Sequence, residues 1–278
     1  MQVKNFKTWE EFESELVELN KETEELKKQK SGYVSPILFR GQSNSQWKLD
    51  STLNRIAVGM ELSKYLAHIR NIENIISTYT GSDWDVSGKI GFYIKKADWD
   101  FFCLLAEKDF LKIVEFMVYL RHHDFPSPLL DWTISPYVAA FFAFNKQFTN
   151  ANEKQVAIFA FREYCHGGKN ISPQEPHITG IGSNLRTHKR HYLQQTEYTI
   201  CGKKGKSGEY ILYSHEDVKS DPTSIPQDVV RKYTIPVSEQ KKVINKLKLM
   251  NISEYSLFGT EDALIRSLAM DMILEYHR

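Results

Sequence analysis

Residues 37–55, ILFRGQSNSQWKLDSTLNR, and residues 120–144, LRHHDFPSPLLDWTISPYVAAFFAF, decide the fold of this chain. In the first stretch, Pro36 precedes the apolar run Ile-Leu-Phe, and Gly41 ends it. A short apolar run bounded by Pro and Gly is typical of a buried strand. We therefore predict a strand that carries Arg40 at its C-terminal end.

The second stretch contains two prolines in residues 122–133, and we predict a loop there. Ser135 and Pro136 then fit the N-cap and the first position of a helix, because the serine oxygen can accept from a free amide and proline has no N–H to leave unpaired. The helix that follows, PYVAAFFAF, is apolar nearly all round. Such a helix is expected to be buried.

The rest of the chain divides into helical and β-rich parts. Residues 8–30 begin with a capping box and place their apolar side chains on one helical face. Residues 56–122 are mostly helical in pattern, and four β-rich runs separated by turn residues lie between 156 and 237. Further helices are expected after Ser238 and Thr260.

No repeat and no long linker interrupts the sequence. We therefore expect one α+β domain over residues 1–278, with an N-terminal helix at 8–30 and a helical insertion at 56–122. Hydrophobic residues make up 41% and charged residues 26%, as in soluble globular proteins. The net charge of +1 excludes a global positive field, so any contact with nucleic acid must use a local patch.

The spacing of the cysteines and the length of the apolar segments indicate where in the cell the protein is expected. Three cysteines lie far apart without a C-x-x-C pair, which suits a reducing environment. The first residues lack a basic segment followed by an apolar run, and no apolar stretch is long enough for a bilayer. We expect a soluble cytoplasmic protein without membrane contact.

The two quoted stretches resemble the signatures of the FRG-domain family, which is named for a Phe-Arg-Gly triplet, here Phe39, Arg40 and Gly41. Weaker likenesses follow in residues 190–199, RHYLQQTEYT, and in residues 233–264. The resemblance implies remote kinship with ADP-ribosyltransferases, which bind NAD as a substrate in the cleft of a split β-sheet. The implied fold is an ADP-ribosyltransferase-like split-sheet core with the helical insertion and the N-terminal helix added.

The resemblance also implies a biological role. It points to bacterial toxin–antitoxin and phage-defence systems, in which some such enzymes modify nucleic acid. The implied function is a toxin that transfers ADP-ribose from NAD to a macromolecule, with RNA as the expected acceptor and a cognate antitoxin or chaperone as a partner. Two alternatives stay open: an NAD glycohydrolase, and a non-catalytic module that binds a ligand or a protein.

In the transferase pattern, an arginine ends the first strand and holds NAD. The resemblance therefore implies a catalytic and NAD-binding role for Arg40, with Gly41 and Gln42 beside it; a guanidinium suits phosphate or ribose through its paired donors. The alternative is a structural Arg40 that pairs with a buried carboxylate such as Asp131. Asp131 lies between two apolar residues and needs a partner when buried, for which Arg40 or Arg121 would serve.

The second element of the pattern matches Asp131, Trp132 and Thr133, of which Thr133 alone keeps a hydroxyl. The resemblance implies that these residues shape the nicotinamide pocket. Trp132 would stack on the nicotinamide or on a base, unless it belongs to the core. His122 and His123 precede this element and would contact the ligand or cap the loop.

The third element is read from Gln195, Thr196 and Glu197, which form Q-x-E. The resemblance implies that Glu197 binds the nicotinamide ribose and stabilises the oxocarbenium-like transition state, while Gln195 touches the acceptor. Alternation along a strand would place both side chains on one face. The alternatives are a surface role for Glu197, and Gln194 in the third position.

Basic residues cluster around this element and after it. Such a cluster can hold the NAD pyrophosphate or an RNA backbone, or can be solvated loop charge. His188 and His191 form an H-x-x-H pair without a third ligand at a recognisable spacing, so we expect no metal. The cluster consists of Arg186, His188, Lys189, Arg190, His191, Lys203, Lys204 and Lys206.

Overall fold

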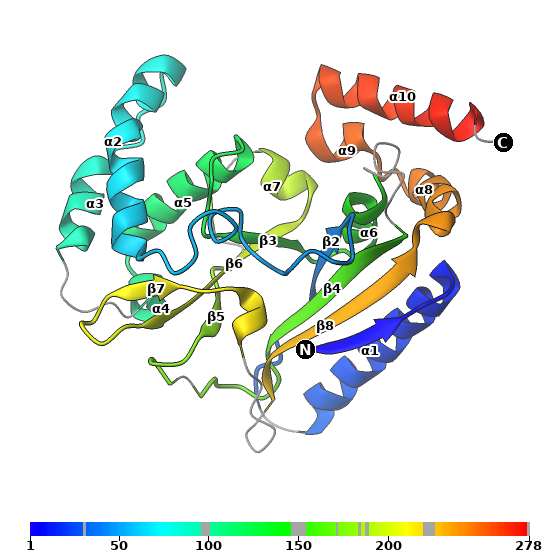
Figure 1. Ribbon diagram of the computed structural model, residues 1–278, viewed down its shortest axis with the longest axis horizontal. Coiled ribbons are helices and arrows are strands. Elements are labelled where there is room, and N and C mark those ends of the chain that lie inside the picture. The colour runs from blue at the N-terminus through cyan, green and yellow to red at the C-terminus, as the bar shows by residue number, and fades with distance from the viewer. Residues whose placement is uncertain are drawn as a thin grey trace.

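The computed structural model describes residues 1–29, 32–95, 101–145, 154–170, 172–182, 185–186, 189–218 and 226–276. These residues are mixed α+β, as predicted, and their strands form one eight-stranded sheet in the order β1-β8-β4-β2-β3-β6-β5, with β7 paired to β6 (Figure 1). β1 runs parallel to β8, and the other neighbouring strands are antiparallel. The strands are β1 (Gln2–Asn5), β2 (Leu38–Gln42), β3 (Leu130–Thr133), β4 (Gln155–Tyr164), β5 (His177–Gly180), β6 (Thr196–Lys204), β7 (Tyr210–Leu212) and β8 (Gln227–Pro236).

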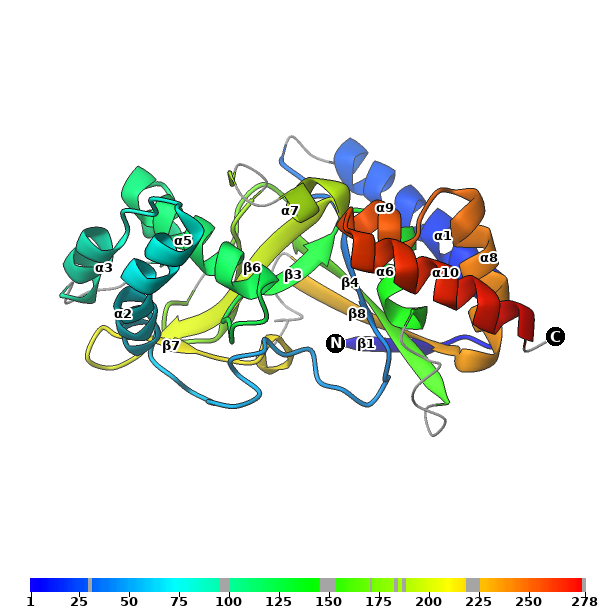
Figure 2. The ribbon, with the colours of Figure 1, turned by 90° about the horizontal axis from the view of Figure 1, so that it is seen from above.

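Helices gather at the two ends of the molecule (Figure 2). One end holds α1 (Trp9–Gln29), α6 (Pro136–Phe144), α8 (Gln240–Leu249), α9 (Glu254–Phe258) and α10 (Glu261–Tyr276). The other end holds α2 (Leu62–Thr80), α3 (Ser87–Ile94), α4 (Phe101–Leu104) and α5 (Lys108–His122), and the short α7 (Lys189–Leu193) precedes β6. Within the described ranges, no helix is both long and apolar enough to cross a membrane.

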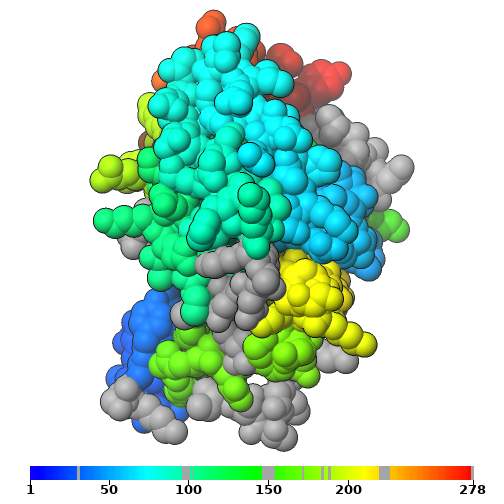
Figure 3. All heavy atoms as spheres, turned by 90° about the vertical axis from the view of Figure 1, so that its left-hand side faces the viewer, coloured from blue at the N-terminus to red at the C-terminus, as the bar shows by residue number. Residues whose placement is uncertain are grey.

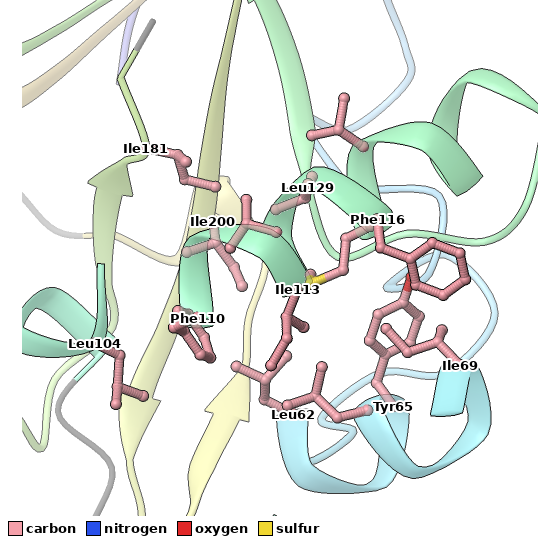
Figure 4. Packing of buried hydrophobic residues seen from close by; sticks show 14 of the residues in the cluster. Leu62, Tyr65, Ile69, Leu104, Phe110, Ile113, Phe116, Leu129, Ile181 and Ile200 are labelled. Atoms are coloured by element: carbon pink, nitrogen blue, oxygen red, sulfur yellow. The ribbon is translucent and has the colours of Figure 1, made fainter. Parts of the chain in front are cut away.

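An apolar cluster joins the helical insertion to the sheet. Leu62 and Ile69 of α2 pack with Phe110 and Ile113 of α5 against Ile200 of β6 (Figure 4). All five side chains are fully buried. Burial of a side chain of this size contributes roughly 1.5–3 kcal/mol, so this cluster holds the insertion firmly on the sheet.

The two halves of the sheet meet where β2 pairs with β3. This pairing consists of Phe39 opposite Thr133. By contrast, β2 pairs with β4 along its full length, and β3 does the same with β6. β2 and β3 therefore part beyond this one pair, on the side where Arg40 and Asp131 lie.

Helix α6 lies directly on β2 at this junction. Its start is capped as predicted: the amide of Val138 donates to Ser135 Oγ at 3.3 Å, and Pro136 is the first helical residue. A Cβ atom at Gly41 would lie 1.9 Å from the carbonyl oxygen of Ala139. Only glycine therefore permits this close approach of strand and helix.

The prediction of a loop over residues 122–133 is wrong at its end, because β3 occupies Leu130–Thr133. Pro126 and Pro128 lie before the strand, so they interrupt none of its hydrogen bonds. The sequence analysis also missed β1 and β5, each of four residues. Strands this short give no periodic signal strong enough to stand out from a loop.

Candidate functional site

A cleft with a volume of about 370 Å³ opens where β2 and β3 part. Residues 39–43 and 131–133 line it from the two strands. Helices α6 and α9, the C-terminal end of α5, the loop after β2 and the start of β6 contribute further lining residues. Segments far apart in the sequence thus meet at the junction between the two halves of the sheet.

Asp131 binds two arginines inside the cleft. Arg40 Nη1 donates to Asp131 Oδ1 at 2.8 Å and to the Asp131 carbonyl oxygen at 2.6 Å. Arg121 Nη2 donates to the same Oδ1 at 2.7 Å. Burial acts to raise the pKa of Asp131, but the charges of Arg121 and Arg40 outweigh it and hold the pKa well below its usual range. Either Arg40 or Arg121 was expected to pair with Asp131, and both arginines do so.

Arg40 and Arg121 together carry more positive charge than Asp131 neutralises. Two guanidinium groups share one carboxylate, so Arg40, Arg121 and Asp131 together have one excess positive charge. Arg40 exposes 14% of its side chain and Arg121 exposes 17%. The Nε atoms of both are buried and have no hydrogen-bond partner among the described residues. The pairing is the one expected of a structural Arg40, yet it leaves charge and donors over for an anion.

Gln42 adds an amide to the same cleft. Its side chain is buried, and Nε2 donates to the carbonyl oxygen of Lys48 at 3.2 Å. Oε1 is buried without a partner in the described part of the chain. Gly41 also lines the cleft, so the three residues 40–42 expected to bind a ligand do lie together.

Aromatic side chains surround the polar floor. Trp47 on the loop after β2 exposes 43% of its surface, and Arg55 Cζ lies 5.9 Å from its ring centroid. Phe142 of α6 and Phe258 of α9 also line the cleft, with ring centroids 6.1 Å apart. Arg190 Cζ lies 5.2 Å from the Phe258 ring. The cleft thus combines cations with flat apolar surfaces.

Trp132 and Thr133 alternate between the two faces of β3. Thr133 is buried in the cleft lining, where its Oγ1 accepts from the Ser135 amide at 3.1 Å. The Trp132 ring is 2% exposed, donates to Thr199 Oγ1 at 2.8 Å, and lies 5.3 Å from the Phe161 ring. These contacts hold the ring in an apolar cluster, which favours the core role over stacking on a ligand.

His122 and His123 do not line the cleft. His122 Nε2 lies 2.8 Å from the hydroxyl of Tyr198, and the His123 ring lies 4.5 Å from the Tyr119 ring. Both histidines therefore contact the protein at the end of α5. These contacts agree with the alternative in which they cap the loop.

The structure brings Gln194, not Glu197, to the cleft. Gln194 is buried in the lining, and its Nε2 donates to the Leu257 carbonyl oxygen at 3.2 Å. Glu197 lies opposite Trp132 in the register of β3 and β6 and shares its face, but unlike Trp132 it is not one of the residues that line the cleft. Burial raises the pKa of Glu197. Gln195 is exposed, with a left-handed φ of 49°, and precedes the strand.

Within the described residues, no three His, Cys, Asp or Glu side chains gather in a way that would hold a metal ion. His188 lies outside the described residues. His191 stacks on the ring of Tyr198 with the centroids 5.6 Å apart.

The two quoted stretches meet in this cleft, since one supplies Arg40 and the other supplies Asp131 and Thr133. Residues 35–152 match the FRG domain. This match covers less than half of the chain and supports the resemblance to the FRG-domain family. A search of curated proteins and a search of solved structures find no match.

The FRG match contains β2, β3 and α6, and therefore most of the cleft. Gln194 and Thr196 come from beyond the match, as do Glu254 and Phe258 of α9. Sequence reasoning missed these α9 residues and the rim formed by Trp47 and Arg55. Trp47 gave a usable signal, because a tryptophan among Asn, Ser and Gln is unusual for a buried segment.

Proposed function

We propose that this cleft binds NAD and that the chain is an ADP-ribosyltransferase, which passes ADP-ribose to a nucleic acid, with RNA as the acceptor. The proposal combines the FRG match with the position and chemistry of the cleft. In this reading NAD is a substrate and is consumed in the reaction.

The observation that carries the proposal is the excess positive charge of Arg40 and Arg121 around Asp131. A charge held away from water requires a counter-charge. Asp131 hydrogen-bonds both guanidinium groups, and Asp124, which also lines the cleft, attracts Arg121 from further away, so Arg40 shares its one carboxylate with a second cation. A pyrophosphate supplies that charge and accepts several hydrogen bonds at once, which suits the planar guanidinium. The flat surfaces of Phe142 and Phe258 are suited to the rings of the same ligand.

The proposed reaction breaks the bond between the nicotinamide nitrogen and the ribose. The electron pair of that bond leaves with nicotinamide. A nucleophile of the acceptor then forms a bond to the cationic ribose carbon and gives its proton to water. In this proposal Gln42 Oε1 and Thr133, which both line the cleft, orient the ligand. Gln194 is placed to accept from a ribose hydroxyl, but an amide supplies less charge to the cationic transition state than a carboxylate does.

A second candidate is a non-catalytic NAD-binding module. The observation that favours it is the position of Glu197, which shares the face of Trp132 and lies outside the cleft lining. Without a carboxylate in the third position, the cleft keeps its binding groups and loses the expected catalytic one. A glycohydrolase needs the same stabilisation of the ribose cation, so the position of Glu197 weighs against it equally.

The role as a toxin of phage defence, with a cognate antitoxin or chaperone, belongs to the same proposal and rests on the family resemblance. Its test is expression of the full chain in bacteria. Growth arrest by the wild type that is relieved in Arg40→Ala would support the role. Equal growth of both strains would count against it.

The function is tested with purified protein in two steps. Calorimetric titration first measures NAD binding by the wild type and by Arg40→Ala. Labelled NAD is then incubated with RNA, DNA and protein, and both transferred label and free ADP-ribose are measured. Binding with transfer to RNA supports the transferase, free ADP-ribose supports the glycohydrolase, and binding with intact NAD supports the module. No binding by a folded wild type would overturn all three.

A further inference from the structure

Two pairs of an aromatic ring and a cation lie outside the floor of the cleft, one exposed and one half-buried. Arg55 lies against the ring of Trp47 at the rim, with Cζ 5.9 Å from the centroid. Lys203 of β6 lies against the ring of Tyr213, just after β7, with Nζ 4.8 Å from the centroid. Each pair presents a flat ring and a positive charge at one place.

Direct hydrogen bonds join the segments that carry these pairs. The Leu49 amide donates to Glu216 Oε1 at 2.9 Å, which fastens the loop after β2 to the turn after Tyr213. The Leu212 amide donates to the Met60 carbonyl oxygen at 3.0 Å, which fastens the end of the same loop to β7. The loop and the β6–β7 hairpin also lie side by side in the space-filling view (Figure 3). We call residues 43–60 and 203–213 together the loop–hairpin surface.

The loop–hairpin surface carries more basic than acidic side chains, since Lys48, Arg55, Lys203, Lys204 and Lys206 face only Asp50 and Glu209 in residues 43–60 and 203–213. Both carboxylates are held by neighbours in the chain: Asp50 Oδ1 accepts from Asn54 Nδ2 at 2.6 Å, and Glu209 Oε2 accepts from the Ser207 amide at 2.9 Å. Four of the cations of this surface, Lys48, Arg55, Lys203 and Lys206, form no ion pair with a carboxylate of the described residues. A hollow of about 560 Å³ lies beside Lys203, Lys206 and Tyr213.

We propose that the loop–hairpin surface binds single-stranded nucleic acid. Trp47 and Tyr213 stack on unpaired bases, and the lysines and Arg55 contact the phosphates between them. A duplex fits this surface less well, because its bases are already stacked on one another. The whole chain has a net charge of +1, so this local patch, not the overall charge, attracts the strand.

In the proposed transferase, the loop–hairpin surface binds the nucleic acid that accepts ADP-ribose. This role rests on the proposed function. Trp47 and Arg55 belong both to the loop–hairpin surface and to the lining of the cleft. A base stacked on Trp47 therefore lies at the mouth of the cavity in which NAD would be held. The strand itself binds whether or not NAD is present.

Fluorescence anisotropy of a labelled single-stranded RNA, without NAD, tests the proposal. We expect Trp47→Ala to weaken binding about tenfold, since stacking on one base is lost. Lys203→Glu/Lys206→Glu should weaken binding further and reduce the slope of log K against log salt by about 1.4, since two phosphate contacts of a single strand are lost. The matched controls are Tyr79→Ala, an exposed aromatic at the far end of α2, and Lys28→Glu/Lys241→Glu, both of which should bind as the wild type does.

The same variants separate this proposal from the proposed function. Lys203→Glu/Lys206→Glu should keep the NAD affinity of the wild type by calorimetry, because neither lysine lines the cleft. Equal loss of RNA binding in the Lys28→Glu/Lys241→Glu control would overturn the loop–hairpin surface. Equal affinity for duplex RNA, or for poly-glutamate, would overturn single-stranded nucleic acid as its ligand. Failure of NAD binding alone would leave the strand-binding result standing.

Discussion

Arg40 on β2 donates to both the side chain and the backbone carbonyl of Asp131 on β3, across the gap that opens where the two strands part. The contact closes the floor of the cleft and fixes the orientation of the arginine. It also combines a structural and a binding role in one residue, because Arg121 shares the same carboxylate oxygen. Substitutions of Arg40, Arg121 or Asp131 should therefore change the stability of the fold and the affinity for NAD by amounts that can be measured separately.

Arg40→Lys should weaken NAD binding about tenfold, because an ammonium keeps the charge but loses the planar set of donors. The matched control is Arg231→Lys, which breaks a two-bond pair between Arg231 and Glu22 at 2.6 and 2.7 Å, away from the cleft. The control should lose comparable stability and keep its NAD affinity. Calorimetric titration and urea denaturation of both variants check the prediction, and equal NAD affinity in the two would refute it.

Asp131→Asn should destabilise the protein at neutral pH, because Arg40 and Arg121 lose their shared counter-charge. We expect a loss of roughly 1–3 kcal/mol, below the figure for a fully buried pair because the Asp131 side chain is 38% exposed. The depressed pKa of Asp131 means that its contribution is present above the unfolded value near ~3.9 and is lost as the pH falls through the folded value. Denaturation of both proteins should show a constant difference above about pH 5, and a difference that grows in acid would contradict this sign.

Gly41→Ala should destabilise the protein by roughly 3 kcal/mol or prevent folding, because the new methyl group meets the backbone of α6. Gly88→Ala is the matched control, since a Cβ there meets nothing within 4 Å and the residue lies in α3. The control should be neutral or more stable by up to about 1 kcal/mol. The midpoints of urea denaturation compare the stability of the two variants. Equal midpoints would show that α6 can move away to accommodate the methyl group.

Asp228 should make stability fall as the pH rises. Its carboxylate lies 2.6 Å from Lys169 Nζ, and burial raises its pKa to about 6. A raised carboxyl pKa gives stability that is complete below the unfolded value and is lost as the pH rises through the folded value. Relative to Asp228→Asn, the wild type should lose roughly 1–3 kcal/mol between pH 4 and pH 7. Asparagine suits the left-handed φ of 49° at this position, so the variant should fold.

Gln194→Ala should weaken NAD binding, whereas Glu197→Gln should leave it unchanged, because the first residue lines the cleft and the second does not. The same two variants also test whether Glu197 takes part in the transfer reaction. If Glu197→Gln abolishes transfer while binding persists, the strand entrance must rearrange when NAD binds and Glu197 regains its expected role. If both transfer and binding persist, Gln194 fills the third position of the pattern.

The parts of the site that could be predicted depend on local signals. The strand that carries Arg40 was predictable from Pro36 and Gly41, and the start of α6 from Ser135 and Pro136, because each signal acts on its own few residues. The need of Asp131 for an arginine partner was also predictable, since a carboxylate between apolar residues cannot stay alone when buried.

The parts that could not be predicted depend on register and on distant segments. The face of Glu197 follows from its pairing with Trp132, and a shift of one residue would have reversed it. The left-handed Gln195 breaks the alternation that sequence reasoning assumed across the Q-x-E segment. Phe258 reaches the cleft from α9, and no sequence spacing links that helix to β2.

The parallel pairing of β1 with β8 sets the order in which this chain can fold on the ribosome. Gln2 pairs with Arg231, so β1 waits roughly 10–50 s for its partner at ordinary rates of synthesis. During that interval Phe12, which packs on Tyr233 of β8 in the finished protein, lacks this part of its core and is open to chaperones. The cleft likewise stays incomplete until α9 has been released, so a nascent chain cannot act before Glu254 and Phe258 reach their places in the lining.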